Sequence, residues 1–250
     1  MADVGSYNSK IKTIEGVLYN GVEKIAEESG VALIVDESTS GLILNNRVTA
    51  NYGTPGYLSV SLVFSDDETG VMGAGGEYSF AQGNNVKSTG YASFATGYLA
   101  EATGHFSIAM GYEVSATAYS SVALGTQNTV SGNYGFAAGR NHDVSHFYGA
   151  AIGDALISKS ASAVVVGQAN TDYTILNPGG NNQSDQPMLI VGNGSITSDS
   201  NNTAVTRSDA LVAYYSGAIV APSLTTALID AGGNKGLVTK EWVMANFTAI

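Results

Sequence analysis

Glycine recurs at every fourteenth position through the central part of the chain. The seven positions, with no insertion between any two, are Gly83, Gly97, Gly111, Gly125, Gly139, Gly153 and Gly167. Strict periodicity of this kind is typical of a solenoid, in which each unit forms one coil and stacks on the next. A unit of 14 residues is too short for two helices or a propeller blade. We therefore predict a parallel β-solenoid whose repeated glycines are turn residues.

Other columns of the repeat indicate how each coil packs. The position two residues before the glycine holds a small residue in six units, and its members are Ala81, Ala95, Ala109, Ala123, Ala137, Ala151 and, in the seventh unit, Val165. The positions on either side of this column are bulkier in most units, as at Phe94 and Met110. Because successive residues of a strand point to opposite faces, the strand has one small-residue face. We expect another backbone to pack closely against that face.

Composition excludes several classes of protein. The chain has 31 Gly but only 4 Pro among 250 residues, which argues against collagen. With 44% hydrophobic and 12% charged residues it has enough apolar material for a core, which argues against disorder. The absence of Cys excludes a disulfide scaffold, a Cys-ligated zinc site and a thiol nucleophile.

Charge and hydropathy exclude two kinds of partner. The net charge of −11 argues against nucleic-acid binding, which requires clustered Lys and Arg. No apolar run approaches the roughly 18 residues of a membrane helix, so we expect no membrane insertion. The first six residues show neither the basic nor the apolar part of a signal peptide, so we do not expect export by that route.

Two units of the repeat carry a family resemblance. The segments Gly90–Gly97 (GYASFATG) and Ala118–Gly125 (AYSSVALG) resemble the head repeat of trimeric autotransporter adhesins. The resemblance implies a homotrimer of left-handed parallel β-rolls with about 14 residues per coil, over residues 76–170. The chain departs from those adhesins because we find neither a signal peptide nor a membrane-anchoring segment in it.

The C-terminal part carries a second resemblance. Four short phrases follow the roll in the order of bacteriophage fibre proteins: Met188–Gly194, Arg207–Val212, Gly217–Leu224 and Gly236–Val243. This order implies a virion protein on the capsid or the tail, assembled in the host cytoplasm.

The residues themselves predict the elements of this C-terminal region. Strands are expected at Ala210–Ser216 and Ala218–Ala221, with Gly217 as the turn between them. A terminal helix at Lys240–Phe247 is expected to follow Thr239 as its N-cap. Residues 171–187 and 197–202 have the composition of loops.

The N-terminal part lacks the 14-residue repeat and shows other hydrophobic patterns. A helical stripe is formed by Ile11, Ile14, Leu18 and Ile25. Alternating apolar residues predict strands at Val31–Val35 and Leu58–Phe64. We therefore divide the chain into an N-terminal attachment segment (1–75), a β-roll (76–170) and a strand-rich C-terminal trimeric tip (171–250).

No motif predicts a catalytic, cofactor or metal site. His142 and His146 are four residues apart, but in a roll such residues need not converge, so inter-coil or surface roles are favoured for them and for His105. The cluster Asp66–Glu68 lacks the ligand spacing of a calcium loop and is interpreted as a solvated turn. Gly73–Gly76 lacks the Lys and Ser or Thr of a phosphate loop.

Enzymatic activity is not expected either. The acids of the roll are scattered along the coils, and they are Glu77, Glu101, Glu113, Asp143 and Asp154. Glycoside cleavage requires two carboxyl groups that flank one bond, and sequence alone leaves such a pair open.

Tyrosine is the remaining candidate for surface recognition. Six tyrosines fall in or near the roll: Tyr91, Tyr98, Tyr112, Tyr119, Tyr134 and Tyr148. Exposed Tyr stacks on sugars or anchors a partner, while Tyr in stacked coils also forms ladders along the seam of a trimer. Both interpretations stay open.

The patterns together predict a homotrimeric, non-enzymatic fibre or spike of a bacteriophage virion. Its N-terminal segment would attach to other virion proteins, and its surface would adhere to host-surface or environmental glycans. Two alternatives remain: a decoration protein that binds only other virion proteins, and a bacterial cell-surface adhesin.

Overall fold

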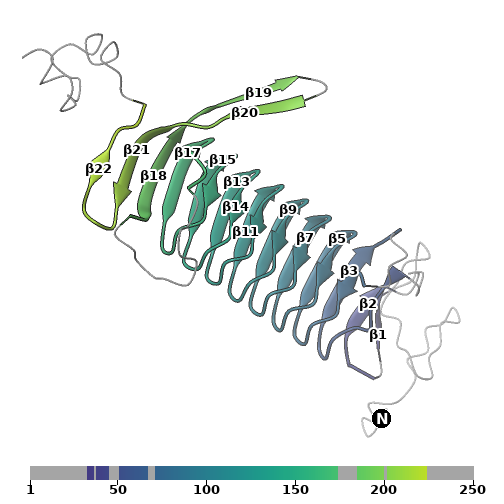
Figure 1. Ribbon diagram of the computed structural model, residues 1–250. Coiled ribbons are helices and arrows are strands. Elements are labelled where there is room, and N and C mark those ends of the chain that lie inside the picture. Colours follow the sequence, from purple (N-terminus) through teal and green to yellow (C-terminus); the bar gives the residue numbers. More distant parts are fainter. Residues whose placement is uncertain are drawn as a thin grey trace, which may run out of the picture.

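The protein is an elongated parallel β-solenoid, and almost all regular structure in the part of the chain that the structure describes is β (Figure 1). The computed structural model describes residues 33–36, 38–44, 51–66, 71–173, 185–199 and 202–223. Each coil from β3 to β16 contributes a five-residue strand to a 13-stranded sheet and a two-residue strand to a 7-stranded sheet. The predicted fold, mainly β with 14-residue coils, is therefore confirmed.

The five-residue strands pair in parallel and form the centre of the larger sheet. They are β3 (Val60–Phe64), β5 (Phe80–Asn84), β7 (Phe94–Tyr98), β9 (Ile108–Tyr112), β11 (Val122–Thr126), β13 (Phe136–Arg140), β15 (Ala150–Asp154) and β17 (Val164–Gln168). The two-residue strands are β4 (Gly73–Ala74), β6 (Lys87–Ser88), β8 (Glu101–Ala102), β10 (Ser115–Ala116), β12 (Thr129–Val130), β14 (Asp143–Val144) and β16 (Ile157–Ser158). From β5 to β17, residues 14 apart lie side by side, as Gly83 and Gly97 do.

The interior of the coil is narrow and is lined by small residues. Ala81, Ala95 and the rest of that column are fully buried and belong to one core cluster with Val86 and Val114 of the opposite turn. The bulkier flanking residues point outward and stay partly exposed, as Phe94 and Met110 do. The expectation that another backbone packs on the small face is confirmed, because the two-residue strands of the same chain lie there.

The repeated glycines lie one residue before the end of each five-residue strand. Their φ angles range from 99° to 143°. At Gly111, where φ is 140°, an added Cβ would also overlap the carbonyl oxygen of Gly125 in the next coil. Backbone conformation and close stacking of coils therefore both require glycine at this position.

Both ends of the parallel stack change to antiparallel pairing. At one end β1 (Leu33–Val35) pairs antiparallel with β2 (Leu42–Leu44), which itself pairs in parallel with β3. At the other end β18 (Pro187–Asn193) pairs in parallel with β17 and antiparallel with β21 (Asp209–Tyr214), followed by β22 (Ile219–Val220). The stacked strands thus extend beyond residues 76–170 in both directions.

The predicted flanking strands are confirmed as β3, β21 and β22, and Gly217 has a φ of 82° between the last two. The predicted strand at Val31–Val35 is described from Leu33, as β1. The terminal helix and the N-terminal stripe lie outside the described residues. Among the described residues, no helix has the length and apolar character of a membrane span.

The loop predicted at residues 197–202 is wrong in part. Ser195–Asp199 (β19) and Asn202–Thr206 (β20) form an antiparallel hairpin that projects from the C-terminal end of the roll (Figure 1). Its polar tip suggested a loop, but the β-branched residues Ile196 and Val205 pair across the two strands. Similarly, the loop predicted to reach residue 187 ends earlier, because Pro187 already belongs to β18.

Candidate functional site

The turn that leads into each five-residue strand has two adjacent positions that carry its outward side chains. We call these two positions the first slot and the second slot. The first slot comprises residues 57, 77, 91, 105, 119, 133 and 147, and the second slot comprises the residue that follows each of these. The second slot has positive φ in each of these coils, as at Phe106 and Tyr134, where φ is 58°. The backbone N–H of Phe106 donates to the carbonyl of Tyr91 in the preceding coil at 2.8 Å, which holds the turns in register.

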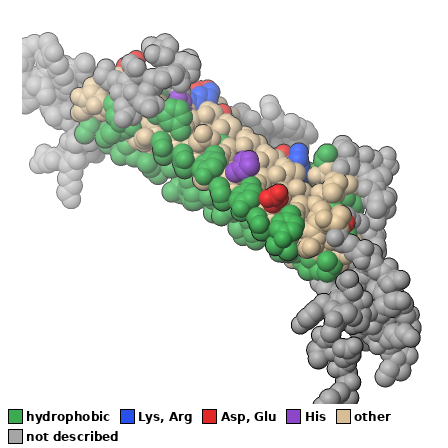
Figure 2. Space-filling view, turned by 90° about the horizontal axis from the view of Figure 1, so that it is seen from below, with side chains coloured by type: hydrophobic (Ala, Val, Ile, Leu, Met, Phe, Trp, Pro, Cys, Tyr) green, Lys and Arg blue, Asp and Glu red, His purple; other side chains and the backbone are tan. Residues whose placement is uncertain are grey.

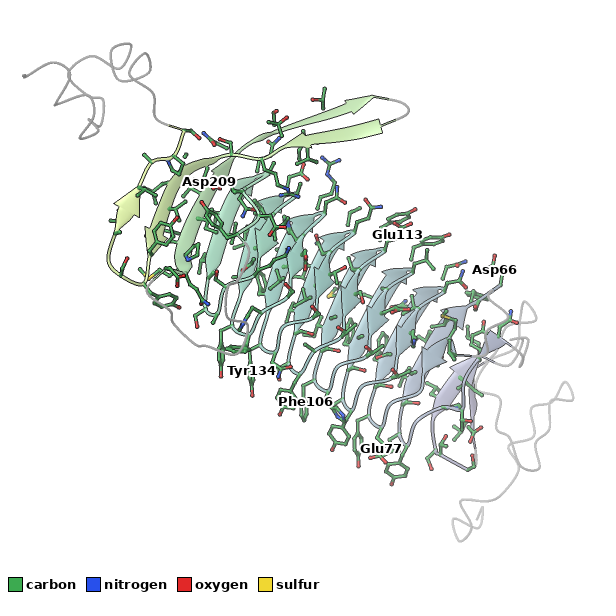
Figure 3. The ribbon with its side chains drawn as sticks, viewed as in Figure 1. Asp66, Glu77, Phe106, Glu113, Tyr134 and Asp209 are labelled. Atoms are coloured by element: carbon green, nitrogen blue, oxygen red, sulfur yellow. The ribbon has the colours of Figure 1, made fainter. Side chains whose placement is uncertain are left out.

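One aromatic residue per coil forms a continuous ladder along this edge. The aromatic ladder comprises Tyr57, Tyr78, Tyr91, Phe106, Tyr119, Tyr134 and Tyr148, and each ring centroid lies 5.0–5.9 Å from the next. These side chains are 37–57% exposed. Phe106 and Tyr134 point away from the roll at its lower edge in Figure 3. Figure 2, seen from below, shows a continuous hydrophobic band along the length of the molecule.

The ladder alternates between the two slots. Tyr57, Tyr91 and Tyr119 occupy the first slot, and Tyr78, Phe106 and Tyr134 occupy the second. Neighbouring rings of this zigzag meet edge to face at interplanar angles of 69–82°.

The last pair of rings in the ladder, Tyr134 and Tyr148, shows what happens when the slot does not alternate. Tyr134 and Tyr148 share the second slot, and their rings stack at 5°. Slot position therefore sets the orientation of one ring relative to the next.

The slots that the ladder leaves unused hold mostly small or polar residues. Ala92 and Ser120 stand beside Tyr91 and Tyr119, while Glu77, His105 and Asn133 precede the second-slot rings. The ring of His105 lies 6.3 Å from that of Tyr91. Each ring therefore projects beside a shorter neighbour, except at the two ends, where Leu58 and Phe147 fill the other slot.

The six tyrosines predicted as candidates fall into two groups. Tyr91, Tyr119, Tyr134 and Tyr148 belong to the ladder. Tyr98 and Tyr112 end the strands β7 and β9 on the opposite edge, where their rings stack at 5.2 Å and 8°. Glu113, which Figure 3 shows on that edge, raises the pKa of Tyr112 by hydrogen bonding and by its charge.

Sequence reasoning missed Tyr57, Tyr78 and Phe106 as members of one surface. Their signal was present in the spacing, because Tyr78, Tyr91 and Phe106 follow one another at steps of 13 and 15 residues. A search for a strict period of 14 overlooks such an alternation.

The candidate histidines of the repeat serve the backbone of the roll. His142 is buried, its Nε2 lies 3.1 Å from the carbonyl oxygen of Ala138, and its Nδ1 accepts from the N–H of Leu156. Burial lowers the pKa of His142. His146 Nδ1 accepts from the N–H of Phe147 at 3.0 Å. Within the described ranges, no three His, Asp or Glu side chains gather as a metal site requires.

The acidic residues occupy separate places along the coils. Glu77 and Glu113 lie on opposite edges of the roll (Figure 3). Asp154 forms an ion pair with Arg140, and burial raises the pKa of Asp143. Asp66 accepts a hydrogen bond from Asn85, while the rest of that acidic cluster lies outside the described residues. Gly73 belongs to the strand β4 rather than to a loop.

A second surface, the outer face of the larger sheet, is broad and apolar. Phe80 and Phe94 stack there at 4.8 Å and 7°, and Met110 and Ile152 are 41% and 50% exposed. Other apolar members include Ile108, Val122, Leu124, Phe136, Val164 and Val166. This outer face carries rings and branched side chains but few hydroxyl groups, unlike the ladder.

Comparison with known families gives one result. The model of the YadA head domain repeat matches twice, at residues 88–113 and 116–141. The coils from β7 to β13 contain YadA head repeats. Four ladder residues, from Tyr91 to Tyr134, lie within these matches. No curated protein and no solved structure matches the chain significantly.

Proposed function

We propose that the chain forms a homotrimeric, non-catalytic fibre that adheres to glycans through its exposed edge. The aromatic ladder carries the proposal, because it places seven exposed rings in one line along the roll. Tyr combines an apolar ring with a polar hydroxyl, which suits the alternating apolar and hydroxyl surfaces of a sugar. Three parallel copies would add their weak contacts by multivalency.

Trimer formation is supported by the outer face of the larger sheet. YadA head domains are trimeric in adhesins, and two stretches of this chain match that head repeat. The partly exposed Phe94 and the half-exposed Ile152 represent apolar surface that a second and third copy would bury. The narrow, alanine-lined interior of one coil gains stability from such association.

A place on a bacteriophage virion is supported by the order of the C-terminal phrases from Met188 onward. In this proposal the N-terminal segment attaches to other virion proteins and the roll projects from the capsid or the tail. A bacterial cell-surface adhesin is equally compatible with the head repeats. A decoration protein that binds only virion proteins would have the same fold and no glycan ligand.

Two measurements on the purified full chain test the proposal. Light scattering should give three times the monomer mass of 25.6 kDa, and a monomer would refute the trimer. An array of bacterial surface glycans should show binding that weakens when Tyr91 and Tyr119 are replaced by Ala. A silent array would favour the decoration protein. Shortening of an incubated polysaccharide would overturn the non-catalytic assignment.

A further inference from the structure

We propose that the aromatic ladder binds an unbranched, uncharged polysaccharide that lies parallel to the solenoid axis and repeats every two sugars. This inference rests on the adhesive function proposed above and names its ligand class. It draws on three features of the ladder: the hydroxyl groups of its rings, its two-coil period and the charge of its slots.

The hydroxyl groups of the ladder require polar partners in any complex. Six of its seven members are Tyr, and the exception is Phe106. No hydrogen bond joins any of these six hydroxyls to another of the described residues. A contact with another copy of the chain would have to supply a hydrogen-bond partner for each of these hydroxyl groups, because burying one unpaired costs free energy. A sugar offers hydroxyl groups at its rim and a C–H face for the ring, so it satisfies both parts of Tyr.

The period of the ladder indicates the shape of the ligand. Rings that share a slot, such as Tyr91 and Tyr119, recur every second coil. Parallel coils advance by about 4.8 Å, so equivalent rings recur at about 9.6 Å. An extended polysaccharide in which each sugar is turned over relative to the last also repeats after two sugars. A ligand of this shape meets the same arrangement of rings at every repeat, whereas a helical or branched chain leaves the line of rings.

The charge of the slots indicates an uncharged ligand. The fourteen slot positions from Tyr57 to Tyr148 include one carboxylate, Glu77, and no Lys or Arg. The whole chain carries a net charge of −11. An anionic polysaccharide would therefore be repelled on approach and would find no Lys or Arg in the slots.

Calorimetry with the full chain and defined oligosaccharides tests this proposal. The probes are linear β-1,4-linked oligomers of glucose and of N-acetylglucosamine with two, four and six sugars. Because each further pair of sugars covers another repeat of the ladder, we expect affinity to rise about tenfold from two to six sugars. The α-1,4-linked glucose hexamer has the same sugar on a coiling backbone and should bind about tenfold more weakly than the linear hexamer.

Two matched variants locate the binding surface. Tyr91→Ala with Tyr119→Ala removes two first-slot rings and should weaken binding of the linear hexamer about tenfold. Tyr98→Ala with Tyr112→Ala removes two stacked rings from the opposite edge and should leave the affinity unchanged. Thermal unfolding and light scattering of both variants report whether fold and oligomer are intact.

Several outcomes would overturn the proposal. Loss of the oligomer in the Tyr91/Tyr119 variant would identify the ladder as a seam between copies. Equal binding of the linear and coiling hexamers, or equal weakening by both variant pairs, would remove the ladder as the determinant. Binding of other glycans on the array without these oligomers would refute the ligand class and leave adhesion standing. A silent array would refute adhesion itself.

Discussion

The ring nitrogen Nδ1 of His142 accepts a hydrogen bond from the backbone N–H of Leu156, one coil further along, at 3.1 Å. In the same column, Oδ1 of Asn128 accepts from the N–H of His142 at 2.9 Å. Two buried polar side chains thus bond successive coils inside the roll. Since Nδ1 accepts, the buried ring is neutral and donates from Nε2 to the carbonyl oxygen of Ala138.

This arrangement predicts acid sensitivity. Burial lowers the pKa of His142 in the folded state below its ordinary 6.5. The contribution to stability is therefore complete above pH 6.5 and is lost as the pH falls toward the lowered value, by at most about 1.4 kcal/mol per pH unit.

Urea unfolding at pH 7.5 and at pH 5 measures this loss, and His142→Asn is the matched variant. Asn keeps an acceptor, as Asn128 shows, but does not titrate. Because all other ionisable groups are the same in both proteins, the difference in their pH dependence of stability reports on residue 142. Equal pH dependence of the two proteins would contradict the assignment.

Gly111→Ala should destabilise the fold strongly. The new Cβ would overlap the carbonyl oxygen of Gly125, and φ is 140° at this position. We expect a loss of roughly 2–4 kcal/mol, measured as a lower midpoint of thermal or urea unfolding. Gly75→Ala is the control, because its Cβ would make an ordinary contact 3.4 Å from the Cγ2 of Thr89. A similar loss in both variants would refute the close-stacking explanation.

Ala92→Gly should stabilise the protein. Ala92 has a φ of 50°, a left-handed conformation that costs a residue with Cβ about 1 kcal/mol. Glycine relieves this strain but gains entropy in the unfolded chain, so we expect a net gain of about 0.5 kcal/mol. The same exchange at Ala95, which is fully buried, should be destabilising. A lower melting temperature for Ala92→Gly would contradict the prediction.

Ile152→Lys should prevent assembly. Ile152 lies on the outer face of the larger sheet and is 50% exposed in one copy, so a charge there harms the fold of the single chain little. Light scattering should then report the monomer mass of 25.6 kDa. Thr129→Lys, at an exposed position of the smaller sheet, should leave the oligomer intact. An unchanged mass for Ile152→Lys would move the interface elsewhere.

The sequence allowed the repetitive part of the fold to be predicted, because one backbone requirement at Gly111 and its equivalents repeats without a slip. It did not reveal that β18 continues the stack, since Leu189 follows its neighbour Val164 after 25 residues instead of 14. The step from Val60 to Phe80 is 20 residues, so the early coils were hidden as well.

The candidate site was recovered only in part for a similar reason. Periodicity groups residues that share a column, but the ladder passes from Tyr91 in one column to Phe106 in another. A ring in either of the two adjacent slots can contact the ring of the next coil. This becomes evident only from the three-dimensional structure of the turn. The inward position of His142 could have been inferred from its column, which also holds the buried apolar residues Val114 and Leu156.

The number of coils in the stack can change independently of the antiparallel strands at its two ends. Among the described residues, β1 and β22 are the edge strands of the larger sheet, so coils gained or lost between them would leave the same two edge strands. The alternation of the ladder depends on whether coils are removed singly or in pairs. Removing one coil would bring two rings of the same slot together, as at Tyr134 and Tyr148, whereas removing two would preserve the alternation. The roll can therefore become longer or shorter by two coils at a time and still present rings that alternate between the two slots.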